Sequence, residues 1–97
     1  MVKVEWDENK DLQNQSKHGI SFEEAQNLFL SGAEYLEVFD WEHSEQEDRF
    51  IAIGPLSRGV VVVVWTPRDE DTVRVISARP ATPRETRLYE TYLERYL

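Results

Sequence analysis

The side chains best suited to chemistry gather where a predicted strand runs into a helix. The segment 72–81 is short and rich in β-branched residues, which favours a strand. A proline follows Arg79 and disfavours helical geometry there, so Arg79 should end the strand with Ser77 on the same face. Thr82 then fits a helix N-cap, and Glu85 completes a capping box. An arginine at this junction suits an oxyanion such as phosphate, although an arginine at a strand end can equally pair with a surface carboxylate.

A second group of candidates closes the first predicted helix. Asp7 fits its N-cap, and the helix ends at Lys17-His18-Gly19, with Gly19 as a left-handed C-cap. Cations are favoured at a helix C-terminus, so Lys17 and His18 have a structural explanation. The same position suits an imidazole that gives up a proton, which makes His18 a candidate general acid. Leu12 is the only apolar residue between the caps, so specific polar contacts must hold this helix, or it frays.

A charged loop precedes the third predicted strand. It runs from Asp40 to Asp48 and contains His43 and Glu47. Its carboxylates and histidine could gather a hard cation, but their spacing matches no known ligand loop, so no metal site is expected. A solvated acidic loop, or one that docks a basic partner, explains the composition better. Arg49 follows Glu47 by two residues, and the two are either an ion pair or a base beside a phosphate-binding cation.

The hydrophobic pattern predicts an α+β fold. Strands are expected at 3–6, 35–39, 49–54, 60–65 and 72–79, and helices at 7–17, 21–30 and 83–97. Short turns between the last three strands imply an antiparallel meander, and the continuous apolar run at 60–65 is typical of a central strand covered on both faces. The order is therefore β-α-α-β-β-β-β-α, an antiparallel sheet packed with helices from the two ends of the sequence.

Length and composition limit the class of protein. Residues 1–97 suffice for a single domain, and the absence of cysteine excludes disulfides and thiolate metal sites. No N-terminal segment resembles a signal peptide and no apolar run is long enough to span a bilayer, so a soluble cytoplasmic protein is expected. The net charge of −8 is uneven: residues 1–48 carry 13 acids and three lysines, and residues 49–97 carry six acids and eight arginines. The arginine-rich second half can therefore form a local positive surface, which would suit phosphate binding.

In combination, these residues resemble the BrnT family, toxins of type II toxin–antitoxin systems. The shared pattern extends over almost the whole chain, and its members are weak singly but specific together. They are Glu5-Trp6-Asp7, Lys10, Asn14, Lys17-His18-Gly19, Phe22, Ala25, Phe29, Glu47-x-Arg49, Gly54, Arg74-Val-Ile-Ser-Ala-Arg79, Ala81, Glu85 and Tyr89. The resemblance implies a RelE/ParE-like fold, a ribonuclease activity that arrests growth, no cofactor, and neutralisation by a BrnA-type antitoxin with a ribbon-helix-helix region. The toxin would contact DNA only indirectly, through that antitoxin.

The resemblance also implies a metal-independent mechanism. A ribose 2′-hydroxyl attacks the adjacent phosphorus, while one group takes its proton and another protonates the leaving 5′-oxygen. His18, beside Lys17, is the candidate acid, and Glu47 is the candidate base. The candidates for holding the phosphate are Arg49, Ser77 and Arg79.

Two other interpretations remain open. A RelE/ParE-like domain without catalysis would act only as the antitoxin's partner, and its acidic first half would then matter more than its arginines. Growth arrest on induction separates this interpretation from a toxin. A gyrase-directed toxin is the other alternative, and it would need no acid–base pair.

Overall fold

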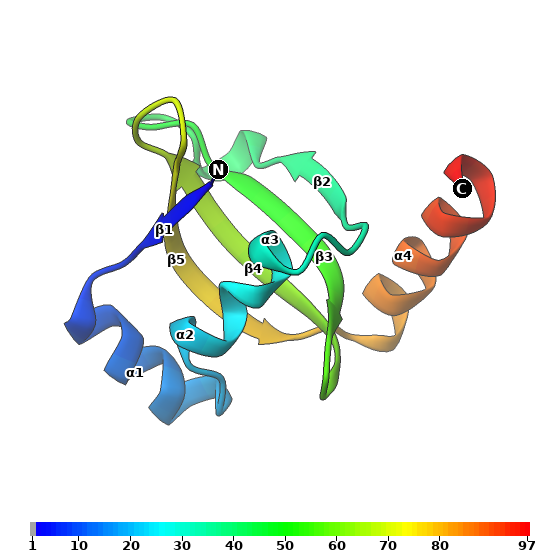
Figure 1. Cartoon of the computed structure of the whole chain (residues 1–97), viewed down its shortest axis with the longest axis horizontal. Coiled ribbons are helices and arrows are strands. Elements are labelled where there is room, and N and C mark those ends of the chain that lie inside the picture. The colour runs from blue at the N-terminus through cyan, green and yellow to red at the C-terminus, as the bar shows by residue number, and fades with distance from the viewer. Residues whose placement is uncertain (1) are drawn as a thin grey trace.

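The computed structural model of the chain describes residues 2–97, which form a five-stranded sheet with helices on both faces (Figure 1). The elements are β1 (Lys3–Glu5), α1 (Glu8–His18), α2 (Phe22–Ala25), α3 (Asn27–Leu30), β2 (Leu36–Phe39), the 3₁₀ turn η1 (Trp41–His43), β3 (Phe50–Leu56), β4 (Gly59–Pro67), β5 (Thr72–Pro80) and α4 (Pro83–Tyr96). The predicted α+β class and the order of the predicted elements are confirmed. No helix among the described residues is long and apolar enough to cross a membrane.

The strands lie in the order β1-β5-β4-β3-β2. The predicted meander of β3, β4 and β5 is confirmed, and β4 is the central strand, as its continuous apolar run indicated. The prediction of a wholly antiparallel sheet is wrong, because β1 pairs in parallel with β5 through Val4 and Val73. This direction has a physical reason. The chain leaves β1 at Glu5, opposite Arg74, and α1 then continues along β5 to Ala78.

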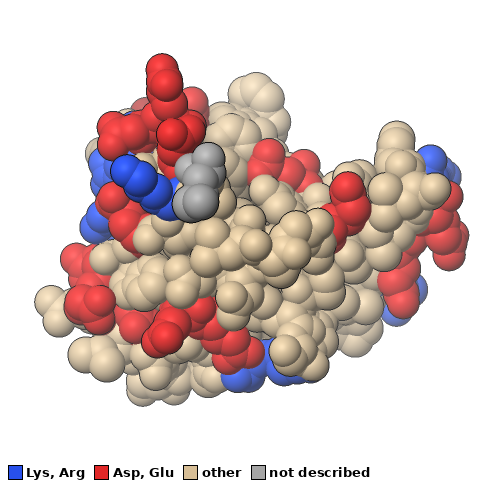
Figure 2. Space-filling view, viewed as in Figure 1, with Lys and Arg blue, Asp and Glu red and all other residues tan. Residues whose placement is uncertain are grey.

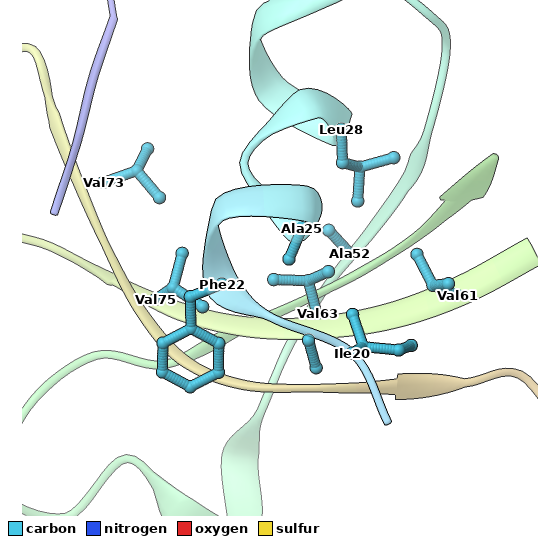
Figure 3. Packing of buried hydrophobic residues seen from close by; sticks show 10 residues of the cluster. Ile20, Phe22, Ala25, Leu28, Ala52, Val61, Val63, Val73 and Val75 are labelled. Carbon is cyan, nitrogen blue, oxygen red and sulfur yellow. The ribbon is translucent and has the colours of Figure 1, made fainter. Parts of the chain in front are cut away.

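The main core lies between the sheet and the helices α2 and α3. Figure 3 shows Phe22, Ala25 and Leu28 packed over Val63 and Val75 of the central strands. The three helical residues are fully buried and recur every third position. An α-helix would rotate such a series away from the sheet, whereas a tighter turn keeps it on one face.

The predicted single helix at 21–30 is therefore two short helices separated at Gln26. The Gln26 carbonyl accepts hydrogen bonds from the N–H groups of both Phe29 and Leu30, which tightens the turn. Ser21 caps α2 by accepting the Glu24 N–H at 3.0 Å. Among residues 2–97, the Glu24 side chain makes no reciprocal bond to the Ser21 N–H; its carboxylate lies instead in a bidentate ion pair with Arg58.

Helix α1 is held by buried polar side chains, as its composition required. The Asn14 amide donates to the carbonyls of Ile20 and Ala78 at 2.9 and 2.8 Å and accepts the Ala78 N–H at 3.1 Å. Asp11 accepts the N–H of Phe22 at 2.8 Å. Asn14 thus satisfies the edge of β5 beyond the end of β1, in place of a neighbouring strand. Leu12 points away from the core and is 63% exposed.

Helix α4 packs on the opposite face of the sheet. The Thr82–Glu85 capping box is present as predicted. Tyr89 packs on Ile53 and Val62, and its buried hydroxyl donates to the carbonyl of Glu34 at 2.8 Å. This smaller cluster covers only one end of that face, because α4 projects beyond the sheet (Figure 1).

Candidate active site

The candidate site occupies the part of the sheet face that α4 leaves uncovered. Ile51, Val64 and Ile76 are half-buried there and line a hollow of about 630 Å³. The polar side chains around this apolar floor come from the loop before β3 and from the end of β5. An open sheet face with charged side chains at its margin can hold an extended, charged ligand such as a nucleic acid strand.

A β-bulge in β5 directs the polar side chains onto this face. Val64 pairs with Ser77 and Trp65 with Val75, so Ile76 has no partner on β4. The extra residue shifts the alternation of the strand, and Ile76 and Ser77 both line the open hollow while Val75 and Ala78 stay in the core. Arg79 lines the same hollow, which confirms that it shares a face with Ser77.

The last turn of α1 adds two more of the predicted residues. Lys17 and His18 line a second hollow of about 340 Å³, together with Arg49, Ile76 and Ser77. Those last three residues line both hollows. Gly19, in the left-handed conformation with φ +73°, ends α1 at this point. The structure therefore gathers five of the six predicted site residues along one continuous surface.

Arg49 lies at the centre of this surface. Its Nη2 is 3.6 Å from the Glu47 carboxylate, a long ion pair. Its Nε is buried and has no hydrogen-bond partner among residues 2–97. A buried donor without a partner costs free energy. Of the two arginines predicted to hold the phosphate, Arg49 is the better placed, because it lines both hollows.

Arg79 is already paired within the protein. Its two terminal nitrogens donate to the two carboxylate oxygens of Glu85 at 2.8 and 2.7 Å. The hydrogen bonds from Arg79 lower the pKa of Glu85 to about 2, and the Thr82 cap adds to the shift. Arg79 therefore reaches the hollow as half of a neutral pair, the alternative that its position at a strand end had left open. Its partner is the capping glutamate of α4.

Glu47 is the one predicted residue that lines neither of these two hollows. It lines a third hollow of about 410 Å³, which shares Glu42, His43 and Arg49 with the 630 Å³ hollow. It does not line either of the hollows that contain Ser77. The structure brings Glu47 to Arg49 and not to Lys17 or His18.

A histidine–carboxylate pair, which was not predicted from the sequence, lies at the margin of the hollow. The His43 Nδ1 lies 3.0 and 3.2 Å from the two carboxylate oxygens of Asp40, and both residues line the 630 Å³ hollow. Trp41 lies between them in the chain, lines the same hollow and is 84% exposed. The spacing of Asp40 and His43 is compatible with a single turn, but no hydrophobic periodicity marks such a turn within a loop.

Charge is distributed unevenly over the molecule. Figure 2 views it from the side of α2 and α3, where acidic side chains are prominent over the N-terminal helices. The arginines of α4, Arg84 and Arg87, line a separate hollow of about 800 Å³ with Arg95. They do not join Arg79 in the candidate site, because the first turn of α4 leads away from the end of β5. No cluster of three or more potential metal ligands is present among residues 2–97.

The comparisons with known proteins agree with this fold. Residues 6–85 match the family described as the ribonuclease toxin BrnT of type II toxin–antitoxin systems. The crystal structure of the Brucella abortus ribonuclease toxin BrnT, at 1.1 Å resolution, is similar with a TM-score of 0.63 and 28% sequence identity. The similarity covers 84% of this chain and 99% of that one. No curated protein sequence matches the chain.

The fold and site define a small α+β protein with a hollow, lined by arginine and serine side chains, on an open sheet face. The chain belongs to the BrnT family of ribonuclease toxins of type II toxin–antitoxin systems. Membership in this family implies RNA as the class of substrate and an antitoxin as the partner. The further likeness to RelE and ParE stays a prediction.

Proposed function

We propose that this toxin cleaves RNA without a metal ion, through attack of a ribose 2′-hydroxyl on the neighbouring phosphorus. One observation carries the proposal: Arg49 and Ser77 line both the hollow that contains His18 and the hollow that contains Arg79. A phosphodiester bound at Arg49 would therefore have Lys17 and His18 on one side and the β5 end on the other.

The roles of the donors follow from their surroundings. The guanidinium of Arg49, which lines both hollows, binds a non-bridging phosphate oxygen, and the Ser77 hydroxyl donates to a second one. Glu47 forms an ion pair with the guanidinium of Arg49 in the 410 Å³ hollow. Arg79, fixed by Glu85, borders the site and contributes a weaker field than a free cation would. Preorganised charge of this kind is often the largest single contribution to phosphoryl chemistry.

Lys17 and His18 act on the leaving group. Both stand in the last turn of α1, where the helix dipole favours positive charge. His18 gives its proton to the departing 5′-oxygen, and Lys17 stabilises the negative charge that develops there. A well-placed acid contributes about 10²- to 10⁴-fold to such a reaction.

An exposed aromatic side chain supports an RNA ligand. Trp41 borders the hollow. Its ring and that of Phe39 pack edge to face, with the two ring centroids 4.6 Å apart. An indole that is held at one edge and open to solvent offers a stacking surface for an unpaired base. The surface thus combines a phosphate site with a base platform, which is the arrangement that single-stranded RNA requires.

Cleavage of an end-labelled RNA by the purified protein in excess EDTA tests the proposal. We expect wild type to cut, and Arg49→Ala and His18→Ala to cut about 10²-fold or more slowly. Arg95→Ala, in the last turn of α4 and outside both hollows of the candidate site, is the matched control and should cut at the wild-type rate. Equal cleavage by wild type and both site variants would remove this mechanism.

We further propose that the antitoxin is of the BrnA type and carries a ribbon-helix-helix region, and that the toxin acts in the cytoplasm. The experiment is co-expression with the product of the neighbouring small reading frame. The two chains should purify together, and only the complex should retard DNA from their own promoter. Retardation by the toxin alone would contradict an indirect contact with DNA.

A further inference from the structure

We propose that His43, oriented by Asp40, is the general base of the RNA cleavage reaction. This inference rests on the proposed function and deepens it. The acid side of the reaction has a candidate in His18, whereas Glu47, the base expected from the sequence, lies outside the hollows that contain Ser77. The structure places a different group, with the chemistry of a base, on the surface where the 2′-hydroxyl would lie.

The geometry of the pair suits proton abstraction. The Nδ1 of His43 lies 3.0 Å from one Asp40 carboxylate oxygen and 3.2 Å from the other. With Nδ1–H donating to the carboxylate, Nε2 keeps its lone pair and can accept a proton. The Asp40 side chain is only 11% exposed, whereas that of His43 is 62% exposed. The carboxylate is therefore the shielded, orienting group, and the imidazole is the accessible one.

The pair is tied to the phosphate-binding arginine by one backbone hydrogen bond and two that the Ser44 hydroxyl makes to the backbone. The Asp40 N–H donates to the Arg49 carbonyl at 2.8 Å. The hydroxyl of Ser44 accepts the Arg49 N–H at 3.0 Å and donates to the Asp40 carbonyl. These three bonds close the loop on itself and hold His43 beside Arg49. A base must stand in a defined position relative to the phosphorus, and this loop supplies that constraint.

His43 also has better access to the site than Glu47 does. It lines the 630 Å³ hollow together with Arg49, Ser77 and Arg79, and it lines the 410 Å³ hollow as well. Of these two hollows, Glu47 lines only the one of 410 Å³, and its carboxylate lies 3.6 Å from Arg49 Nη2. A carboxylate that neutralises the phosphate ligand would lose that ion pair on accepting a proton, whereas His43 is free of such a conflict.

The reaction balances without water or a cofactor. The 2′-hydroxyl proton passes to His43 Nε2 as the bond from the 2′-oxygen to phosphorus forms. The bond from phosphorus to the 5′-oxygen breaks, and the 5′-oxygen takes a proton from His18. The products are a 2′,3′-cyclic phosphate and a 5′-hydroxyl. His43 then returns its proton to solvent and His18 regains one, so the enzyme is restored with no net change in protons.

A substrate with a better leaving group separates the base from the acid. In an oligoribonucleotide whose scissile 5′-oxygen is replaced by sulfur, the thiolate leaves without protonation, so loss of the acid no longer matters. We expect His43→Ala to cleave both the oxygen and the sulfur substrate about 10²- to 10⁴-fold more slowly than wild type. His18→Ala should be slow on the oxygen substrate and near the wild-type rate on the sulfur one. Glu45→Ala, in the same loop, is the control and should match wild type on both.

Two further measurements distinguish catalysis from a structural role. Added imidazole should restore part of the activity of His43→Ala, since the vacated position is open to solvent. Asp40→Asn should lower kcat more than it raises KM and should shift the acidic limb of the pH profile. Thermal unfolding of each variant near the wild-type midpoint shows that the fold is kept.

The outcomes separate this inference from the function on which it rests. If wild type cleaves and His18→Ala does not, the proposed function stands. His43→Ala cutting within threefold of wild type would then refute the base assignment alone, as would recovery of His43→Ala on the sulfur substrate. A wild-type protein that cleaves neither substrate would overturn the proposed function and the inference together.

Discussion

A buried asparagine, rather than an apolar stripe, should determine the stability of α1. Asn14 makes three hydrogen bonds, to the carbonyls of Ile20 and Ala78 and from the N–H of Ala78. Ile20 and Ala78 are fully buried, so water cannot replace the lost partners without opening the core. We therefore expect Asn14→Ala to be far more costly than the truncation of an ordinary helix residue.

The magnitude follows from the number of bonds. Each contributes about 1 kcal/mol net, and a buried group left unsatisfied costs about 1–3 kcal/mol. Loss of all three bonds, with some relaxation of the backbone, should lower the free energy of unfolding by about 3–5 kcal/mol. Total stabilities of about 5–15 kcal/mol are typical for proteins of this kind. The variant should therefore be close to unfolding and should also misplace Lys17 and His18 at the end of α1.

Urea denaturation followed by tryptophan fluorescence measures this difference. The matched control is Leu12→Ala, which removes the only apolar side chain of the same helix. Because Leu12 is 63% exposed, its truncation should cost less than about 0.5 kcal/mol. A cost below about 1 kcal/mol for Asn14→Ala, or an equal cost for the two variants, would refute the reasoning.

Two more predictions concern packing and acid stability. A Cβ on Gly54 would lie 2.6 Å from Leu28 Cδ1 and 2.7 Å from Tyr35 Cβ. Gly54→Ala should therefore lower the free energy of unfolding by about 1–3 kcal/mol in the same urea assay. An unchanged urea midpoint would contradict this prediction. The pKa of Glu85 is lowered from 4.5 to about 2 in the folded protein, so its stabilising effect is complete above pH 4.5 and is lost as the pH falls toward 2. Since the Arg79 side chain is 38% exposed, solvent screening reduces this effect to about 1 kcal/mol. Between pH 5 and pH 2, the free energy of unfolding of Glu85→Gln should therefore fall by about 1 kcal/mol less than that of wild type. Urea unfolding at each pH measures this difference. Parallel pH dependence of the two proteins would exclude the ion pair as a source of acid sensitivity.

The sequence predicted the features that depend on local rules. The N-caps Asp7 and Thr82, the left-handed Gly19 and the central strand β4 can each be recognised from a few neighbouring residues. The polar composition of α1 also predicted that polar contacts would hold it, although it did not reveal their partners. Those partners lie as far as 64 residues away in the chain, and no local pattern specifies them.

Other features were missed because they depend on pairing between distant segments. The parallel direction of β1 follows from the route that α1 takes along β5. The division of the predicted helix at Gln26 follows from three buried residues spaced by three, which local helix propensity does not register. For Arg79, pairing with a surface carboxylate was left open as one of two alternatives. Its partner Glu85 was predicted only as a helix cap, and the structure shows that one carboxylate serves as both cap and ion-pair partner.

For the site, the sequence by itself determined which kinds of side chain are present and where they stand along the chain. It placed Ser77 and Arg79 at a strand end, Lys17 and His18 at a helix end, and Arg49 at the start of a strand. Only the tertiary structure decided that these three segments meet around Arg49, that Glu47 pairs with Arg49 without lining the hollows that contain Ser77, and that His43 hydrogen-bonds to Asp40. The physical reason is that a bulge in β5 and a closed loop before β3 set the directions of these side chains, and both arise from hydrogen bonds between residues that are not neighbours in sequence.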